Sequence, residues 1–352
     1  MGFKHQHPVL GTTSCPSSRA AVVTAGYDDW RCPPDVERLS VKAEATIRQT
    51  LRQYVETPTA GVQKWFRLTD AGGKGLRPRL VLLAASLGSS PVERDQLLRA
   101  AGAVEVLHVA TLYHDDVIDN ATLRRGRQTL NAEHGNAVAI CVGALLFAIA
   151  ARELSDLGTF AQRFGPIVTR ELCAGELWEL EGAFDVDIDA SDYEQIAARK
   201  TSSLFIFAVL LGLSMSGGTS TQEDALEKYA LHLGLAFQLA DDALDFLGER
   251  DRLGKDVGAD LRAGVYTLPV VVALGSAEHG GPLRRLLLDS QLDERSLDEV
   301  ATRVIDAGGV ADTLERARTH SALAVEALSA VSSNDACSAL ARLALLASSR
   351  SR

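Results

Sequence analysis

Two groups of aspartates stand in otherwise apolar stretches of the sequence. The groups are Asp115, Asp116 and Asp119 in VEVLHVATLYHDDVIDN, and Asp241, Asp242 and Asp245 in LGLAFQLADDALDFLG. Carboxylates this close together repel one another, and an apolar helix tolerates that cost only when cations compensate it. Mg²⁺ prefers carboxylate oxygens together with water and substrate phosphate, and aspartates at i and i+4 can reach one ion or a close pair. We therefore predict a magnesium site built from both groups.

The spacing of each group places its side chains on one face of a helix. Gln238, Asp241, Asp242 and Asp245 fall at i, i+3, i+4 and i+7, which is one stripe. If the two aspartate helices face each other in a bundle, the stripes form a polar, metal-binding cavity inside an apolar shell. The alternative is that each DDxxD is a solvated helix face or complements a helix N-terminus. Two occurrences with Leu, Ala, Val and Phe at neighbouring positions favour the metal site.

Four basic segments could bind the phosphate oxygens of a metal-bound diphosphate. GGKGLRPRL, LRRGRQTLN, RKTSS and RLGKDVGAD contribute Lys74, Arg77 and Arg79; Arg124, Arg125 and Arg127; Arg199 and Lys200; and Lys255. Any one of these segments alone is more often an ordinary surface charge. The second and fourth segments follow the two aspartate groups directly along the chain, however, and this pairing favours a diphosphate site.

We predict a structural role for three of the histidines and substrate contact for a fourth. A lone helical histidine is more often a structural residue than a ligand, and we assign that role to His134, His232 and His320. His108 lies two turns before Asp115, so we predict that it contacts substrate.

The elements that carry these residues are predicted to be helices. From residue 36 onward, apolar residues recur at helical spacing between short loops such as LGSSP (87–91) and MSGGTS (215–220). Alternating strand patterns are missing, and aromatic residues make up only 5% of the chain, which favours helix over sheet. We expect an all-α fold, a large helical bundle with a central metal-lined cavity. Residues 1–35 are predicted to form a flexible tail and residues 36–350 a single catalytic domain.

Composition narrows the class of protein further. The net charge of −10 opposes nonspecific binding to nucleic acid or anionic lipid. The five cysteines form no CxxC pair, so neither a zinc site nor a disulfide framework is indicated. The longest apolar stretch, residues 137–150, is too short for a transmembrane segment and is predicted to be a buried core helix. With no signal-peptide core in residues 1–34, a cytoplasmic location is expected.

Five motifs together resemble the trans-isoprenyl diphosphate synthase, or polyprenyl synthetase, family. They are GGKGLRP (72–78), LYHDDVIDNATLRRG (112–126), KT (200–201), FQLADD (237–242) and GKDVGADL (254–261), in the order and approximate spacing of that family. The resemblance covers roughly residues 42–345. It implies an isoprenoid-synthase fold, a homodimer, and a prenyltransferase that joins an allylic diphosphate to isopentenyl diphosphate. The product is a linear trans-polyprenyl diphosphate.

The same resemblance implies a role for each matching residue. The aspartates Asp115, Asp116, Asp119, Asp241 and Asp242, with Asp245 beside them, hold about three Mg²⁺ ions that clamp the allylic diphosphate. Contacts to that diphosphate come from Arg124, Lys200 and Lys255. Isopentenyl diphosphate is held by Lys74, Arg77, His108 and Arg125. Gln238 and Thr201 steady the developing allylic cation.

Two positions depart from the family pattern. Val265 stands in GVYT, where many members carry lysine in GKxT, and Gly75 stands where many carry a long side chain. We expect activity to survive, because the other cations and both aspartate groups are intact.

Two rival functions remain open on this resemblance. A terpene cyclase of the same fold would need no isopentenyl site. The sequence has the residues assigned to that site, which argues against a cyclase: Lys74, Arg77, His108 and Arg125. A noncatalytic subunit of a heteromeric prenyl synthase could lose its aspartates, whereas this chain has both groups.

Product length is predicted from the helix before the first aspartate group. Short-chain members resemble one another in placing a bulky aromatic residue five or four positions before Asp115. Ala110 and Thr111 occupy those positions here. Neither side chain could block a tunnel for the growing product, and Leu107 is flexible enough to leave a passage. We therefore predict a medium or long chain, roughly six or more isoprene units.

Overall fold

The computed structural model describes residues 30–55, 75–124, 126–247, 259–288 and 292–349. The elements are α1 (Pro34–Val55), α2 (Leu76–Ala85), α3 (Arg94–Ile118), β1 (Leu123–Arg124), β2 (Arg127–Gln128), α4 (Leu130–His134), α5 (Asn136–Ser155), α6 (Thr159–Glu181), α7 (Ala190–Ala197), the π-helix η3 (Ala198–Ser202), α8 (Ser203–Met215), α9 (Ser220–Leu247), α11 (Ala259–Ala263), α12 (Leu268–Leu274), α13 (Gly280–Leu287), α14 (Glu294–Asp306), α15 (Gly309–Ala327), the 3₁₀ turn η4 (Leu328–Ala330) and α16 (Asp335–Ser348). The prediction of an all-α fold is confirmed, with one two-stranded hairpin among the described residues.

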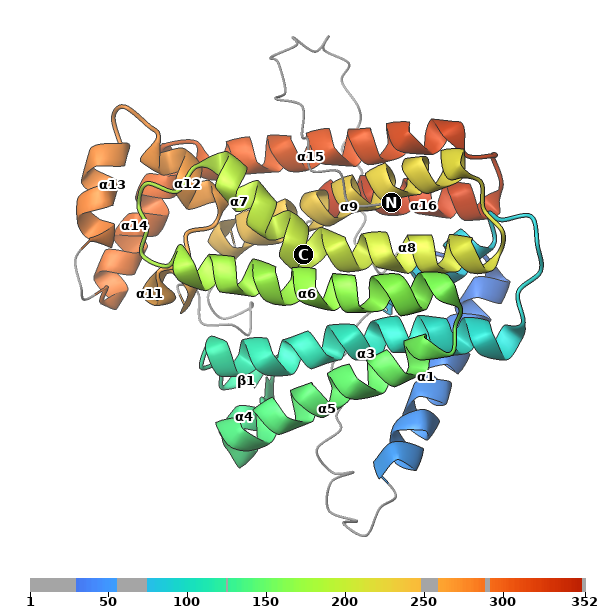
Figure 1. Cartoon of the computed structure of the whole chain (residues 1–352). Helices are drawn as coiled ribbons and strands as arrows, with labels where there is room; N and C mark the ends of the chain where they lie inside the picture. The colour runs from blue at the N-terminus through green and yellow to red at the C-terminus, as the bar shows by residue number, and fades with distance from the viewer. Residues whose placement is uncertain (1–29, 56–74, 125, 248–258, 289–291, 350–352) are drawn as a thin grey trace.

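The axes of the long helices are nearly parallel. Figure 1 shows α3, α6, α8 and α15 extended along the bundle, with α11 to α14 gathered at one end. Helix α3 packs on α5, α2 packs on α8, and α9 packs on both α8 and α15. Both aspartate groups lie near the C-terminal ends of their helices, so the packing of α3 and α9 decides whether they meet.

Two apolar cores meet along α9. The larger core contains residues of α1, α2, α3, α5, α6, α8 and α16, and the smaller one contains residues of α7 and α11 to α15. The first half of α9 packs into the larger core through side chains such as Leu226 and Leu233. Its second half packs into the smaller core through Leu239 and Ala243. A helix of 28 residues is about 42 Å long, long enough to join both cores.

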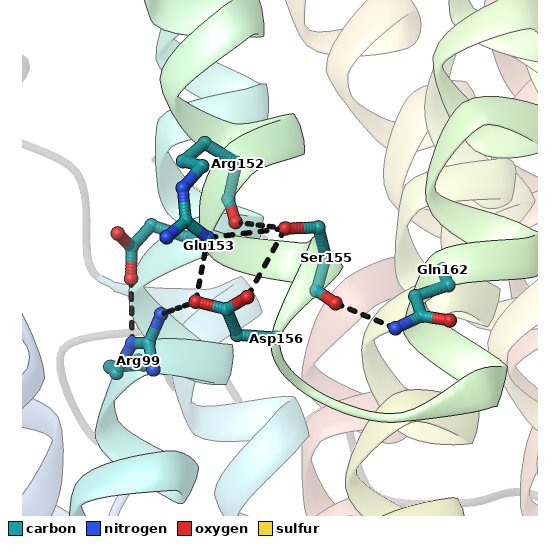
Figure 2. A network of polar contacts seen from close by, with 6 residues as sticks. All are labelled: Arg99, Arg152, Glu153, Ser155, Asp156 and Gln162. Carbon is teal, nitrogen blue, oxygen red and sulfur yellow. Dashed lines mark hydrogen bonds and ion pairs between the residues drawn. The ribbon is translucent and has the colours of Figure 1, made fainter.

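A polar network fixes α3, α5 and α6 at the end of the bundle away from the first aspartate group (Figure 2). Nε of Arg99 in α3 donates to Oε2 of the buried Glu153 at 2.7 Å, and a terminal guanidinium nitrogen donates to Asp156 at 3.3 Å. Gln162 of α6 donates to the backbone carbonyl of Ser155 at 2.7 Å. These contacts tie the start of α3 to the end of α5 and the start of α6.

The residues just before α1 already pack against the helical bundle. Trp30 is buried, and its indole nitrogen donates to the carbonyl of Ala339 in α16 at 3.0 Å. Arg79 of α2 lies 5.6 Å from the Trp30 ring centroid and pairs with Glu37 at 2.9 Å. The predicted tail, residues 1–35, therefore overlaps the packed structure at residues 30–35, and its remainder lies outside the described residues.

Helix α5 differs from the predicted buried core helix at residues 137–150. It is 20 residues long, and only 44% of its most apolar window is buried. This helix and the continuous segment Ala190–Met215, whose most apolar window is 78% buried, are each long and apolar enough to span a membrane by length and composition. Ile140 and Leu145 on α5 are exposed to 48% and 37%. The prediction of a buried core helix holds for the face that packs into the larger core. It does not hold for the other face, because the helix is apolar on both faces and hydropathy could not distinguish the uncovered side.

Candidate active site

Asp116 is held by the segment that follows α3. Nε of Arg124 donates to Oδ1 of Asp116 at 2.7 Å, and the Asn131 side chain donates to the Asp116 backbone carbonyl at 3.0 Å. Helix α3 ends at this point, with Asp119 as its C-cap and Asn120 in the left-handed region at φ 50°. Asparagine tolerates that conformation better than most residues. The turn sends the chain into the β1–β2 hairpin, which returns Arg124 to the aspartate group.

Asp115 and Asp119 lie in a strongly acidic environment. Burial raises the pKa of Asp115 to about 7, with further increases from the negative charges of Glu176 and Asp119 and decreases from Lys200 and Arg124. Desolvation by neighbouring protein atoms also raises the pKa of Asp119, a more exposed side chain, to about 6; Lys200 opposes this rise, and Asp260 and Glu176 add to it. Carboxylates of α6 and α11 are therefore close enough to act on the α3 aspartates.

Lys200 is bound by two of the α6 carboxylates. Its Nζ lies 2.8 Å from Oε2 of Glu176 and also pairs with Glu179. Burial lowers the pKa of Lys200, but the charges of Glu179 and Glu176 outweigh that effect, so the pKa is raised overall. Sequence reasoning missed both glutamates, since GELWELEG resembles many polar helix ends. Their spacing of i and i+3 on one helical face was the only local signal.

Lys200 and Thr201 belong to the π-helix η3, which connects α7 to α8. Glycines on both neighbouring helices allow close approach to this turn. A Cβ at Gly175 of α6 would lie 2.9 Å from the Lys200 backbone nitrogen, and one at Gly234 of α9 would lie 2.6 Å from Cα of Ser202. Single π turns within helices often occur at functional sites. Here the turn places two consecutive predicted site residues between α6 and α9.

A chain of hydrogen bonds joins Thr201 to the second aspartate group. Oγ1 of Thr201 donates to Oε1 of Gln238 at 2.8 Å, and Nε2 of Gln238 donates to Oδ1 of Asp242 at 2.9 Å. The hydroxyl of Tyr193 in α7 donates to Oδ2 of the same carboxylate. The chain therefore connects α7, η3 and α9. Tyr193 carries no signal in the sequence, because it lies outside every aspartate and basic motif.

The other predicted binding residues are only partly described. The guanidinium of Arg77 in α2 lies 4.9 Å from the ring centroid of Phe205. His108 lies on α3, two turns before the aspartates, and its side chain is half-buried. Lys74, Arg125 and Lys255 fall outside the described residues. Contacts among the predicted isopentenyl diphosphate ligands therefore remain a prediction.

One other charged side chain of the basic segments, Arg199, has structural partners, and Val265 lies in the turn after α11. Arg199 pairs with Glu171 and lies 4.2 Å from the ring centroid of Trp178. Val265, at the position where lysine is common in similar sequences, is half-buried, and its backbone nitrogen donates to the Asp260 carbonyl at 2.8 Å.

The donor set fits a hard divalent cation. Asp241 and Asp245 of α9 are half-buried at i and i+4, and Asp115 of α3 is half-buried near other negative charges. Across the part of the chain that the structure describes, no three His, Cys, Asp or Glu side chains form one metal-binding group. Mg²⁺ does not need such a group, because it keeps several waters and binds one or two protein carboxylates together with substrate phosphates. The carboxylates around Asp115 and Asp119 outnumber the cations that pair with them, and such an ion would neutralise the excess charge.

Comparison with known proteins identifies the family of this chain. The polyprenyl synthetase family model matches residues 63–304. Octaprenyl diphosphate synthase of Haemophilus influenzae is 32% identical over 323 residues, covering 90% of this chain and 94% of that protein. Nonaprenyl diphosphate synthase of Mycobacterium tuberculosis is 36% identical over 276 residues, covering 78% and 81%.

A solved structure supports the same assignment. The polyprenyl synthase of Caulobacter crescentus, determined with calcium and isoprenyl diphosphate, aligns with a TM-score of 0.80 at 32% identity, covering 90% of this chain and 97% of that one. The extent of these matches and the shared fold lead to one conclusion: the chain belongs to the polyprenyl synthetase family.

Proposed function

We propose that this protein is a Mg²⁺-dependent prenyltransferase that condenses an allylic diphosphate with isopentenyl diphosphate to give a linear trans-polyprenyl diphosphate of medium or long chain. The observation that carries the proposal is the position of η3 between the two aspartate groups. Lys200 acts electrostatically on Asp115 and Asp119 of α3. The next residue, Thr201, is joined through Gln238 to Asp242 of α9. A diphosphate bound there would meet carboxylates from both helices, a lysine and a hydroxyl. We retain a cytoplasmic location as part of this proposal.

Each residue has a role in the proposed reaction. Asp115, Asp116 and Asp119 of α3, with Asp241, Asp242 and Asp245 of α9, would hold about three Mg²⁺ ions. When bound, these ions neutralise charge on the departing diphosphate. Lys200 and Arg124 would bind the same diphosphate through charge-assisted hydrogen bonds. The arrangement lowers the cost of breaking the allylic carbon–oxygen bond, whose electron pair leaves with the diphosphate.

The remaining steps form and neutralise a carbocation. The isopentenyl double bond attacks the allylic carbon, and the new cation loses a proton from the adjacent carbon to the released diphosphate. The oxygens of Thr201 and Gln238 would face the cationic carbons and stabilise their charge. Apolar side chains of the bundle would exclude water, which would otherwise convert the cation to an alcohol.

Product analysis tests the proposal. The purified protein is incubated with Mg²⁺, farnesyl diphosphate and labelled isopentenyl diphosphate, and the dephosphorylated products are separated by chain length. We expect a labelled linear polyprenol longer than farnesol. A cyclic hydrocarbon formed from the allylic substrate alone would identify a terpene cyclase. Product formation only after addition of a partner chain would identify a subunit of a heteromeric enzyme.

Arg77→Ala is expected to raise the Michaelis constant for isopentenyl diphosphate roughly 10- to 100-fold, since a charge-assisted contact contributes about 1.5–3 kcal/mol. The Michaelis constant for the allylic substrate should change far less. Steady-state kinetics with each substrate varied in turn measures both. The matched control is Arg79→Ala on the same helix, whose guanidinium pairs with Glu37. Equal changes for the two substrates would show that Arg77 is assigned to the wrong pocket.

We also propose a homodimer, in agreement with the family resemblance. Exposed apolar side chains on α5 and α6 support it, because large uncovered apolar patches are typical of protein interfaces. Ile140 of α5 is 48% exposed and Leu177 of α6 is 63% exposed.

Light scattering at micromolar concentration should give the mass of a dimer for the wild-type protein. Ile140→Arg should reduce this mass toward that of one chain, because a buried charge without a partner opposes association. The control is Val41→Arg on α1, where an apolar side chain is 67% exposed on a different helix. A monomeric wild-type protein, or a dimer unaffected by Ile140→Arg, would contradict this interface.

A further inference from the structure

Tyr193 is a buried tyrosine whose hydroxyl contacts the second aspartate group. It lies on α7, whose N-cap Asp189 accepts a hydrogen bond from the Asp192 backbone nitrogen at 2.9 Å. Its hydroxyl donates to Oδ2 of Asp242, which is also buried. A hydrogen bond to a carboxylate is stronger than one between neutral groups. Tyr193 therefore restrains the carboxylate from a helix that carries no other predicted site residue.

The restraint extends through Asp242 to Gln238 and Thr201. A carboxylate accepts hydrogen bonds only, so Gln238 must direct its NH₂ group to Asp242. The Gln238 amide nitrogen lies 2.9 Å from Oδ1 of Asp242, and its carbonyl oxygen is then left to accept from the Thr201 hydroxyl at 2.8 Å. The direction of each bond follows from the one before it. With Tyr193 on one carboxylate oxygen and Gln238 on the other, Asp242 has one preferred orientation.

Other buried tyrosines show what a purely structural role looks like in this fold. The Tyr229 hydroxyl donates to the Leu340 backbone carbonyl at 2.8 Å, and the Tyr266 hydroxyl lies 3.4 Å from the Leu287 carbonyl. Buried tyrosine hydroxyls usually find such a partner, and a backbone carbonyl is sufficient for packing. Tyr193 differs because its partner is an ionisable side chain that in turn orients two further polar groups.

We propose that Tyr193 is a positioning residue for the prenyl-transfer reaction. Tyr193 holds Asp242 and, through Gln238, orients the Thr201 hydroxyl towards the reacting carbons. This inference rests on the proposed function, because it assigns Thr201 and Gln238 to the allylic cation. Partners that orient metal ligands typically change metal affinity or activity by 10- to 100-fold when they are removed. Tyr193 itself need not touch substrate.

Tyr193→Phe tests the proposal, with Tyr229→Phe as the matched control. Both changes remove one buried hydroxyl that donates to a buried acceptor, so we expect similar decreases in Tm. Only Tyr193→Phe should lower kcat, by roughly 10- to 100-fold at saturating Mg²⁺. The Michaelis constant for isopentenyl diphosphate should stay within about twofold of wild type, since that substrate binds elsewhere. Equal kcat values for the two variants would overturn the proposal.

A double-mutant cycle measures the coupling between two substitutions in their effects on kcat, and a loss of packing alone would not produce such coupling. If Tyr193 acts through the hydrogen-bonded chain, Thr201→Val and Tyr193→Phe should lower kcat together by much less than the product of their separate effects. Effects that multiply would show that the two residues act independently and would refute the assigned route.

Failure of the proposed function can be told apart from failure of this inference. A wild-type protein that makes no polyprenyl product refutes the function. The positioning claim is then decided by crystal structures of the wild-type and Tyr193→Phe proteins. A rotated Gln238 amide in the variant supports the claim, and an unchanged Gln238–Thr201 pair overturns it.

Discussion

Asp115→Asn is expected to abolish nearly all turnover while the helical content of the protein stays unchanged. Asparagine has the size of aspartate but cannot supply the charge that a magnesium ion requires. Several kcal/mol of transition-state stabilisation would be lost, which corresponds to a decrease in kcat of roughly 1,000-fold or more. Asp241→Asn on α9 should have a comparable effect. Turnover and circular dichroism are measured together on each variant.

The same substitution should stabilise the metal-free protein at alkaline pH. Burial, with the charge of Glu176 adding to it, raises the pKa of Asp115 from 3.8 to about 7. Between these values the unfolded chain releases a proton that the folded chain keeps, so stability falls as the pH rises through this window. Above pH 7 the whole cost of the buried charge remains. Asparagine carries no charge, so at pH 8 the Tm of the variant should exceed that of the wild-type protein by about 2 °C or more. Near pH 4 the two Tm values should differ little.

Asp306→Asn provides the control, because Asp306 is exposed at the end of α14. It should leave turnover and the pH dependence of Tm unchanged. Near-wild-type turnover in both Asp115→Asn and Asp241→Asn would refute the metal assignment. If the Tm of Asp115→Asn at pH 8 matches or falls below the wild-type value, the negative charge of Asp115 does not destabilise the metal-free protein.

Ala110→Phe is expected to shorten the dominant product to roughly three or four isoprene units while sparing the condensation rate. Ala110 lies on α3 five residues before Asp115 and is fully buried. A phenyl ring at this position would form a floor for the growing chain, away from the groups that break and form bonds. Products made from farnesyl diphosphate and labelled isopentenyl diphosphate are compared by chain length.

Thermal unfolding distinguishes a tunnel from a filled core at this position. A ring that enters an open tunnel should leave Tm close to wild type, whereas overpacking a closed core costs about 1–3 kcal/mol. Ala110→Ser is the control, since it adds an oxygen but little volume, and it should make the wild-type product. The tunnel interpretation fails if the wild-type protein already stops at farnesyl diphosphate, or if Ala110→Phe makes an unchanged product.

Local sequence patterns were sufficient for the fold class and the family. The helical spacing of apolar residues predicted an all-α chain, and the described residues confirm it. The ordered motifs predicted the polyprenyl synthetase family, and the family model and relatives confirm it. Both predictions depend on information within one or two helical turns, or on the order of motifs along the chain. The role of each site residue stays a prediction, and the experiments above address it.

The pairing of residues from different helices was decided only by tertiary structure. Nothing local distinguishes Glu176 and Glu179 from other glutamates, and they meet Lys200 only because Gly175 lets α6 approach η3 closely. Tyr193 reaches Asp242, 49 residues later, through the packing of α7 near α9.

The extent of burial was also a tertiary property. Hydropathy predicted a buried core helix at residues 137–150, yet one face of α5 is left uncovered. The physical reason is the same in each case. Helical periodicity records which side chains share a face, whereas the neighbour of that face depends on close packing between elements far apart in the sequence.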